Sequence, residues 1–170
     1  QRKGKSVDID SLLQEKRYRT INTLIRENKI ILEEVVNVFY RTIFSPEECQ
    51  YYTAELSDFL TKISFDFNEM ADIAIKINCP VFNETLCNRL RQSRVNNITI
   101  DRIVLLLNSF VSDRTNNDPH YGMDVSILFS RLFEMYVNEA NLNDAMKSII
   151  ETKNARLITC FEYFAKRNNA

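Results

Sequence analysis

Apolar residues recur at every third or fourth position along most of this chain, which is the spacing of helices that bury one face. The densest apolar segment spans residues 100–111, and Thr99 stands where a helix N-terminal cap would lie. Apolar side chains cover so much of its circumference that we expect it to be the central buried helix. Its apolar members are Ile103, Val104, Leu105, Leu106, Leu107 and Phe110.

Capping residues and prolines between the apolar runs predict where the other helices begin and end. The sharpest signal is the Ser-Pro-Glu-Glu segment at 45–48, where serine can cap, proline fits the first helical position and glutamate completes a capping box. Asn28 marks a break after which the first apolar run continues, as one long helix or as two. Cys79 precedes a proline and should avoid the helical conformation, so the helix before it should stop ahead of Cys79. Further predicted starts are Ser11, Asp66, Pro80 or Asn83, Thr99, Asp124, Asn141 or Asn143, and about Ala155.

The chain has only two glycines and three prolines among its 170 residues, too few for the tight turns that sheets need. We therefore predict an all-α fold of eight or nine helices, largely antiparallel helical hairpins with short loops. Predicted helix starts near residues 46, 83 and 123 recur at about 40 residues, the period of HEAT-type helical pairs. This favours a HEAT-like short superhelical stack, and the alternative is a globular bundle around helix 100–111.

Length and charge limit what the chain can be. We assign residues 1–10 to a basic, flexible lead and 11–170 to a single domain, because 45% hydrophobic residues suffice for one core. A formal net charge of −1 creates no global field that would draw the protein to nucleic acid or an anionic membrane. No segment is apolar for long enough to predict a membrane span.

The four cysteines, Cys49, Cys79, Cys87 and Cys160, predict reduced core thiols. Seven residues separate Cys79 from Cys87, which suits neither a zinc site nor a redox pair, so we expect no metal and no cofactor. These features favour a cytoplasmic or nuclear protein. Sequons at Asn83 and Asn97 support the alternative of a secreted protein that carries glycans and oxidises its thiols.

Candidate catalytic chemistry is confined to one segment. Residues 115–122 are dense in turn formers and predict the longest loop, in which His120 lies beside Asp118 and Tyr121. Asp118 could orient His120 as a base, but no nucleophile can be placed near them, so we interpret these three residues as a contact loop. With so few glycines there is no glycine-rich phosphate loop. We therefore expect no enzymatic activity and no small-molecule substrate.

Charged residues are distributed unevenly along the chain. Residues 47–72 hold seven acids and one base, Lys62, which predicts an acidic surface. Residues 86–100 hold no acid, and there Arg91 and Arg94 are spaced to share one helix face. These arginines could grip a partner or pair internally with the acidic segment. The candidate partner-binding residues are Arg89, Arg91 and Arg94, with Lys16, Arg17 and Arg19 of the first helix as the rest of a phosphate-binding stripe.

Together these features predict a non-enzymatic helical interaction or scaffold module that binds a peptide or helix of a partner protein on a helix-lined surface. Two alternatives follow from single features. The sequons and the even number of cysteines suggest a secreted, cytokine-like ligand. The arginines suggest an RNA-binding helical scaffold segment.

Overall fold

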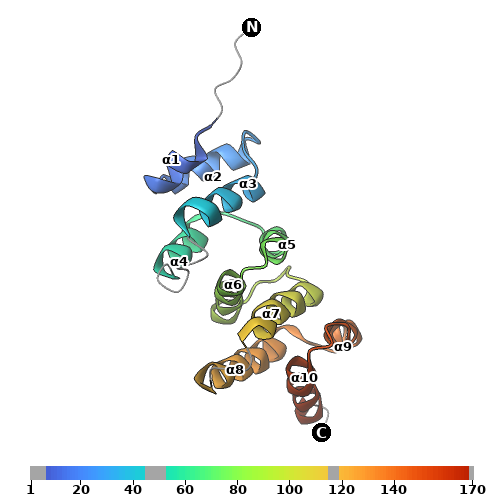
Figure 1. Cartoon of the computed structure of the whole chain (residues 1–170). Helices are drawn as coiled ribbons and strands as arrows, with labels where there is room; N and C mark the ends of the chain where they lie inside the picture. The colour runs from blue at the N-terminus through green and yellow to red at the C-terminus, as the bar shows by residue number, and fades with distance from the viewer. Residues whose placement is uncertain (1–6, 45–52, 115–118, 169–170) are drawn as a thin grey trace. The chain divides into compact units, whose positions relative to one another are not determined.

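The computed structural model of the chain describes residues 7–44, 53–114 and 119–168 (Figure 1). Within these ranges the chain forms ten α-helices and one π-helical segment without any strand, which confirms the all-α fold and exceeds the predicted helix number. No described helix combines the length and the apolar composition that a membrane crossing requires. The chain divides into two compact units, residues 1–66 and 67–170. A single domain over residues 11–170 stays a prediction.

Unit 1 comprises five helical elements: α1 (Ile9–Gln14), α2 (Tyr18–Arg26), α3 (Leu32–Val38), the π-helical η1 (Phe39–Ile43) and α4 (Thr53–Lys62). Its core contains stacked aromatic rings, with the centroids of Phe39 and Phe59 4.0 Å apart. The Asn22 side chain joins α2 to the end of α4, because its Nδ2 donates to the Lys62 carbonyl at 2.9 Å and its Oδ1 accepts from the Ser64 amide at 2.9 Å.

Helix boundaries in unit 1 correct the sequence-based prediction. Asp8, not Ser11, caps α1, and the Ser11 amide and hydroxyl donate to its carboxylate at 3.1 and 2.8 Å. These hydrogen bonds lower the pKa of Asp8. The first apolar run contains two breaks, at Lys16 and at the predicted Asn28, where φ is 56° and 59°. The predicted start at 45–48 lies outside the described residues.

Unit 2 contains α5 (Phe67–Ile77), α6 (Pro80–Gln92), α7 (Ile100–Arg114), α8 (Pro119–Tyr136), α9 (Leu142–Glu151) and α10 (Ala155–Asn168). Helix α7 contacts α5, α6, α8 and α9, which confirms its central place in this unit (Figure 1). Ile103, Val104, Leu106 and Leu107 are fully buried, as predicted. Leu105 is different, because 45% of it is exposed.

The contacts within unit 2 follow the order of a stack of helical hairpins. Helices consecutive in sequence contact each other in the pairs α5–α6, α7–α8 and α9–α10. Between hairpins, α7 contacts α5 and α9, and α8 contacts α6 and α10. This arrangement agrees with antiparallel hairpins, and the more specific HEAT-like class stays a prediction.

Several helix boundaries in unit 2 agree with their sequence signals, and one does not. Pro80 is the first residue of α6, and Cys79 before it is extended with φ −99° and ψ 115°. Asn141, one of the two predicted starts, is the residue before α9, although its side chain makes no capping hydrogen bond to that helix. Helix α8 begins at Pro119 and not near Asp124, so residues 119–122 are helical and the predicted loop is shorter. Proline at the first helical position has its φ preset for a helix and outweighs the turn formers around it.

Candidate functional site

The predicted arginine cluster does not form on one helix face. Helix α6 ends at Gln92 and Ser93 is extended, so Arg94 is not part of the helix that holds Arg91. The Arg94 Nη1 donates to the Met135 carbonyl at 2.5 Å, and its guanidinium lies 5.7 Å from the ring centroid of Tyr136. Arg94 thus satisfies a carbonyl in the last turn of α8, where a positive charge is favourable.

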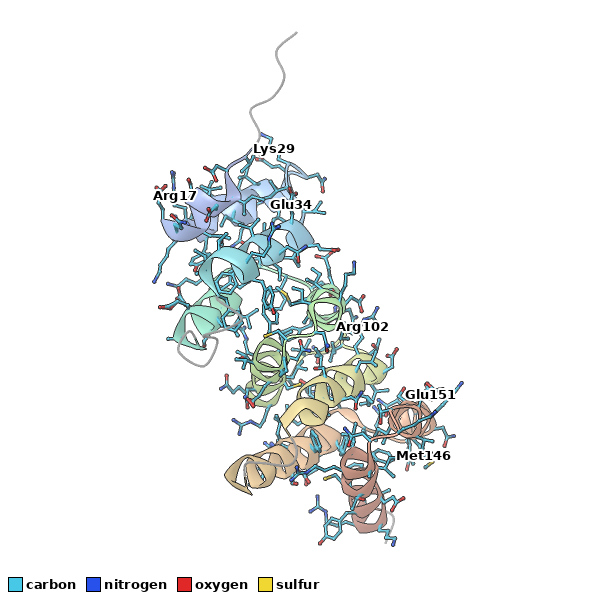
Figure 2. All side chains as sticks on the ribbon, viewed as in Figure 1. Arg17, Lys29, Glu34, Arg102, Met146 and Glu151 are labelled. Carbon is cyan, nitrogen blue, oxygen red and sulfur yellow. The ribbon has the colours of Figure 1, made fainter. Side chains whose placement is uncertain are left out.

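The remaining predicted basic residues are distributed over both units. On α6, Arg89 is partly buried and has contacts of its own, whereas Arg91 is exposed. In unit 1, the exposed Lys16 and Arg17 lie in the turn between α1 and α2, and Arg17 is labelled in Figure 2. Arg19 lies in the first turn of α2. The expectation of a first helix that holds all three is therefore wrong. A combined phosphate-binding stripe stays a prediction.

The predicted contact loop is partly helical. His120 and Tyr121 belong to the first turn of α8, and Asp118 lies outside the described residues. The helical backbone at 119–122 corrects the interpretation of these positions as loop.

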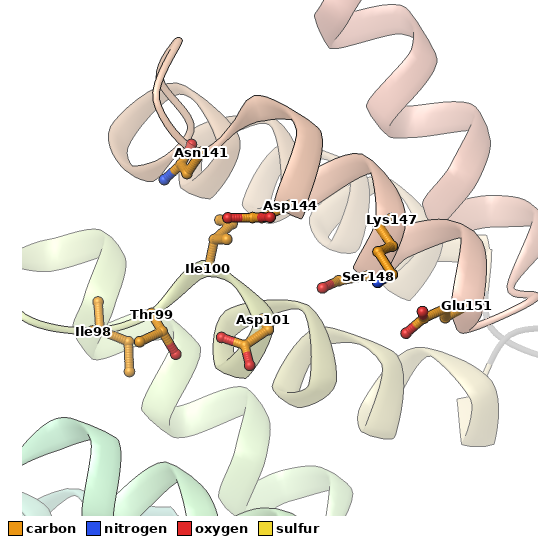
Figure 3. Close-up of a pocket in the computed structure, with 9 residues that line it drawn as sticks. All are labelled: Ile98, Thr99, Ile100, Asp101, Asn141, Asp144, Lys147, Ser148 and Glu151. Carbon is orange, nitrogen blue, oxygen red and sulfur yellow. The ribbon is translucent and has the colours of Figure 1, made fainter.

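A cleft of about 550 Å³ between the start of α7 and one side of α9 was not predicted (Figure 3). On the α7 side, it is lined by Ile98, Thr99, Ile100 and Asp101. On the α9 side, it is lined by Asn141, Asp144, Lys147, Ser148 and Glu151. Figure 3 shows Asp144, Ser148 and Glu151 along the side of α9 that faces α7, with Asp101 opposite.

The charged side chains of the cleft have no partners elsewhere in the described part of the chain. Asp101, Asp144, Lys147 and Glu151 form no hydrogen bond or ion pair among those residues. Arg102, which follows Asp101 in sequence, does not pair with it and instead donates to both carboxylate oxygens of Asp72, at 2.8 and 3.1 Å. This hydrogen bonding lowers the pKa of Asp72. Three carboxylates therefore face one ammonium group in the cleft, an excess of two negative charges.

The positions of these acids in their helices differ. Asp101 and Asp144 lie in the first turns of α7 and α9, where a negative charge stabilises the helix. Glu151 is the last residue of α9, where a negative charge is unfavourable to the helix. Helix stability thus accounts for the first two acids and leaves Glu151 without a structural reason.

An exposed apolar residue extends the α7 side of the cleft. Leu105 lies four residues after Asp101, so helical spacing places both on the same side of α7. It is 45% exposed, whereas its neighbours Val104 and Leu106 are fully buried. Carboxylates beside an apolar side chain suit a ligand that combines positive charge with an apolar group.

The described residues contain no group of three or more His, Cys, Asp or Glu that could hold a metal ion. Of the predicted core thiols, Cys79 and Cys87 are buried and Cys160 is partly exposed, and their reduced state stays a prediction. Burial raises the pKa of Cys87, so its thiol stays protonated. Cys49 lies outside the described residues.

Comparison of the chain with protein-family models, with curated proteins and with solved structures finds no match in any of the three.

Proposed function

We propose that this chain is a non-enzymatic helical interaction module that binds a positively charged segment of a partner protein in the cleft between α7 and α9. One observation supports this proposal above the others: the cleft has three carboxylates from two helices that form no ion pair with any described residue and outnumber its single ammonium group. Positively charged groups of a partner would form ion pairs with these carboxylates. The hairpin order of unit 2 agrees with the proposal, because stacked hairpins present helix-lined surfaces to peptides.

The size and lining of the cleft define the part of the partner that it receives. A volume of about 550 Å³ accommodates a few side chains and not a whole helix. The carboxylates would accept hydrogen bonds from lysine or arginine, and the exposed Leu105 would contact an apolar residue of the same segment. The expected partner is thus an amphipathic helix or peptide whose basic and apolar residues lie side by side.

The proposal is tested with a fluorescent amphipathic peptide that has lysines on one face and leucines beside them. Its affinity for the full chain is measured by fluorescence anisotropy at low and high salt, for the native sequence and for Asp101→Asn with Asp144→Asn. Exposed ion pairs contribute about 0.2 to 1 kcal/mol each, so losing two should weaken binding about 2- to 30-fold. Added salt should weaken binding to the native chain more than binding to the variant.

The control is Glu34→Gln with Glu162→Gln, which removes the same net charge at exposed positions outside the cleft. Glu34 also lies in the first turn of its helix, as Asp101 and Asp144 do. The control should bind the peptide like the native chain. Equal affinity for the native chain and the Asp101/Asp144 variant would contradict the proposal, and so would an equal loss in the control.

A further inference from the structure

One of the two sequons lies in the core of unit 2. Asn83 is in the first part of α6 and is completely buried, with 0% of its surface exposed. Its Nδ2, the atom that would bear a glycan, donates to the Ser109 hydroxyl of α7 at 2.5 Å. Ser109 in turn donates to the Leu106 carbonyl at 2.7 Å, and the Asn83 Oδ1 is buried as well. The amide is therefore part of the contact between α6 and α7.

A glycan at this atom cannot be accommodated in the fold. In N-linked glycosylation a bond forms between Asn Nδ2 and C1 of an oligosaccharide, the bond from C1 to its lipid pyrophosphate carrier breaks, and one amide proton is released. The product is bulky and hydrophilic and needs a position at the surface. Phe82, Leu86 and Cys87 around Asn83 on α6 are all fully buried, and a core at this packing density has no space for a sugar.

The second sequon provides an internal comparison. Asn97 lies in the connection between α6 and α7 and is exposed, so a glycan there would extend into solvent. A glycan is therefore incompatible with the folded structure at Asn83 and compatible with it at Asn97, although both sites have the same sequence pattern.

We infer that N-glycosylation at Asn83 and folding of unit 2 are mutually exclusive. This inference is independent of the proposed binding function. It removes Asn83 from the support for a secreted ligand.

The test directs the full chain into the secretory pathway of cultured mammalian cells with an added signal peptide. Two versions are compared, both with Asn97→Gln so that Asn83 is the only remaining sequon: one otherwise native, and one with Thr85→Ala. The second change abolishes the sequon but keeps Asn83 and Ser109, and removes only the bond from the Thr85 hydroxyl to the Val81 carbonyl within α6. Both versions are also made in bacterial cytosol, where circular dichroism should show the same cooperative melting.

In the secretory pathway, the version with Thr85 should gain a glycosidase-sensitive mass at Asn83 and be retained without cooperative melting. The Thr85→Ala version should be secreted and melt as the cytosolic protein does. Secretion of a cooperatively folded protein that carries a glycan on Asn83 would overturn the inference, whereas a folded fraction without that glycan would agree with it. Equal retention of both versions would overturn it too, because the sugar would not be the cause.

Discussion

The hydroxyl of Tyr136 should be one of the most important single polar groups in unit 2. Tyr136 is 7% exposed at the end of α8, and its hydroxyl donates to the Leu90 carbonyl of α6 at 2.8 Å. The same oxygen accepts from the Val95 amide at 3.1 Å. One atom thus joins the end of α6, the following connection and the end of α8. Tyr136→Phe removes this atom and keeps the ring.

The expected cost follows from the two groups that lose their partner. Leu90 lies in the last turn of α6, where carbonyls have no partner within the helix, and the Val95 amide lies beyond the helix end. Each hydrogen bond contributes about 0.5 to 1.5 kcal/mol, so the variant should lose about 1 to 3 kcal/mol of unfolding free energy. The packing of the ring and its contact with Arg94 stay in place.

The measurement is urea unfolding, with amide hydrogen exchange to locate the loss. Protection of the Val95 amide should decrease most, and the urea dependence of the unfolding free energy should stay unchanged. Tyr163→Phe is the matched control, because Tyr163 on α10 is 69% exposed and should change stability by less than about 0.5 kcal/mol. If Tyr136→Phe is as stable as this control, the hydroxyl does not join the two helix ends.

Two further changes test the core and the helix ends. Leu106→Ala, at a fully buried position of α7, should cost about 2 to 5 kcal/mol in chemical unfolding, whereas the 45% exposed Leu105→Ala should cost less than about 1 kcal/mol. Similar losses at the two neighbours would mean that the buried face of α7 is misplaced. Lys16→Gly should raise the free energy of unfolding by about 0.5 kcal/mol, measured by thermal unfolding, because lysine at a φ of 56° is strained and glycine is not. Lys16→Ala has no such benefit, and an equal effect of both changes would argue against strain at this position.

The sequence predicts those parts of the fold that depend on local chemistry. Pro80 begins α6 and extends Cys79 because the proline ring limits the residue before it. The apolar period identifies α7 as the central helix of unit 2, since a helix buried on most sides needs apolar residues on most sides. The exposed Leu105 shows the limit of this reasoning. Residue type alone does not reveal which apolar side chain faces outward.

The candidate site depends on long-range contacts and could not be predicted in the same way. Asp101 and Asp144 are far apart in sequence and meet only because α7 packs against α9. In the sequence, neither residue differs from the other acids that lie near the starts of helices. Conversely, Arg94 seemed available for a partner, but the end of α6 at Gln92 turns it toward the Met135 carbonyl. Charge patterns in a sequence predict surfaces only when the helix ends are known.

The scarcity of glycine determines how this chain ends its helices. Left-handed residues that usually are glycine are here Lys16, Asn28, Asn78 and Lys153, each just after a helix. After α1 the Lys16 amide donates to the Leu13 carbonyl at 3.0 Å and the Arg17 amide to the Leu12 carbonyl at 2.9 Å, the pattern of a Schellman motif. Local hydrogen bonds therefore stabilise a conformation that is unfavourable for lysine. The few glycines correctly predict that the described ranges contain no sheet. They do not imply long uninterrupted helices, because asparagine and lysine can form the same breaks at a modest energetic cost.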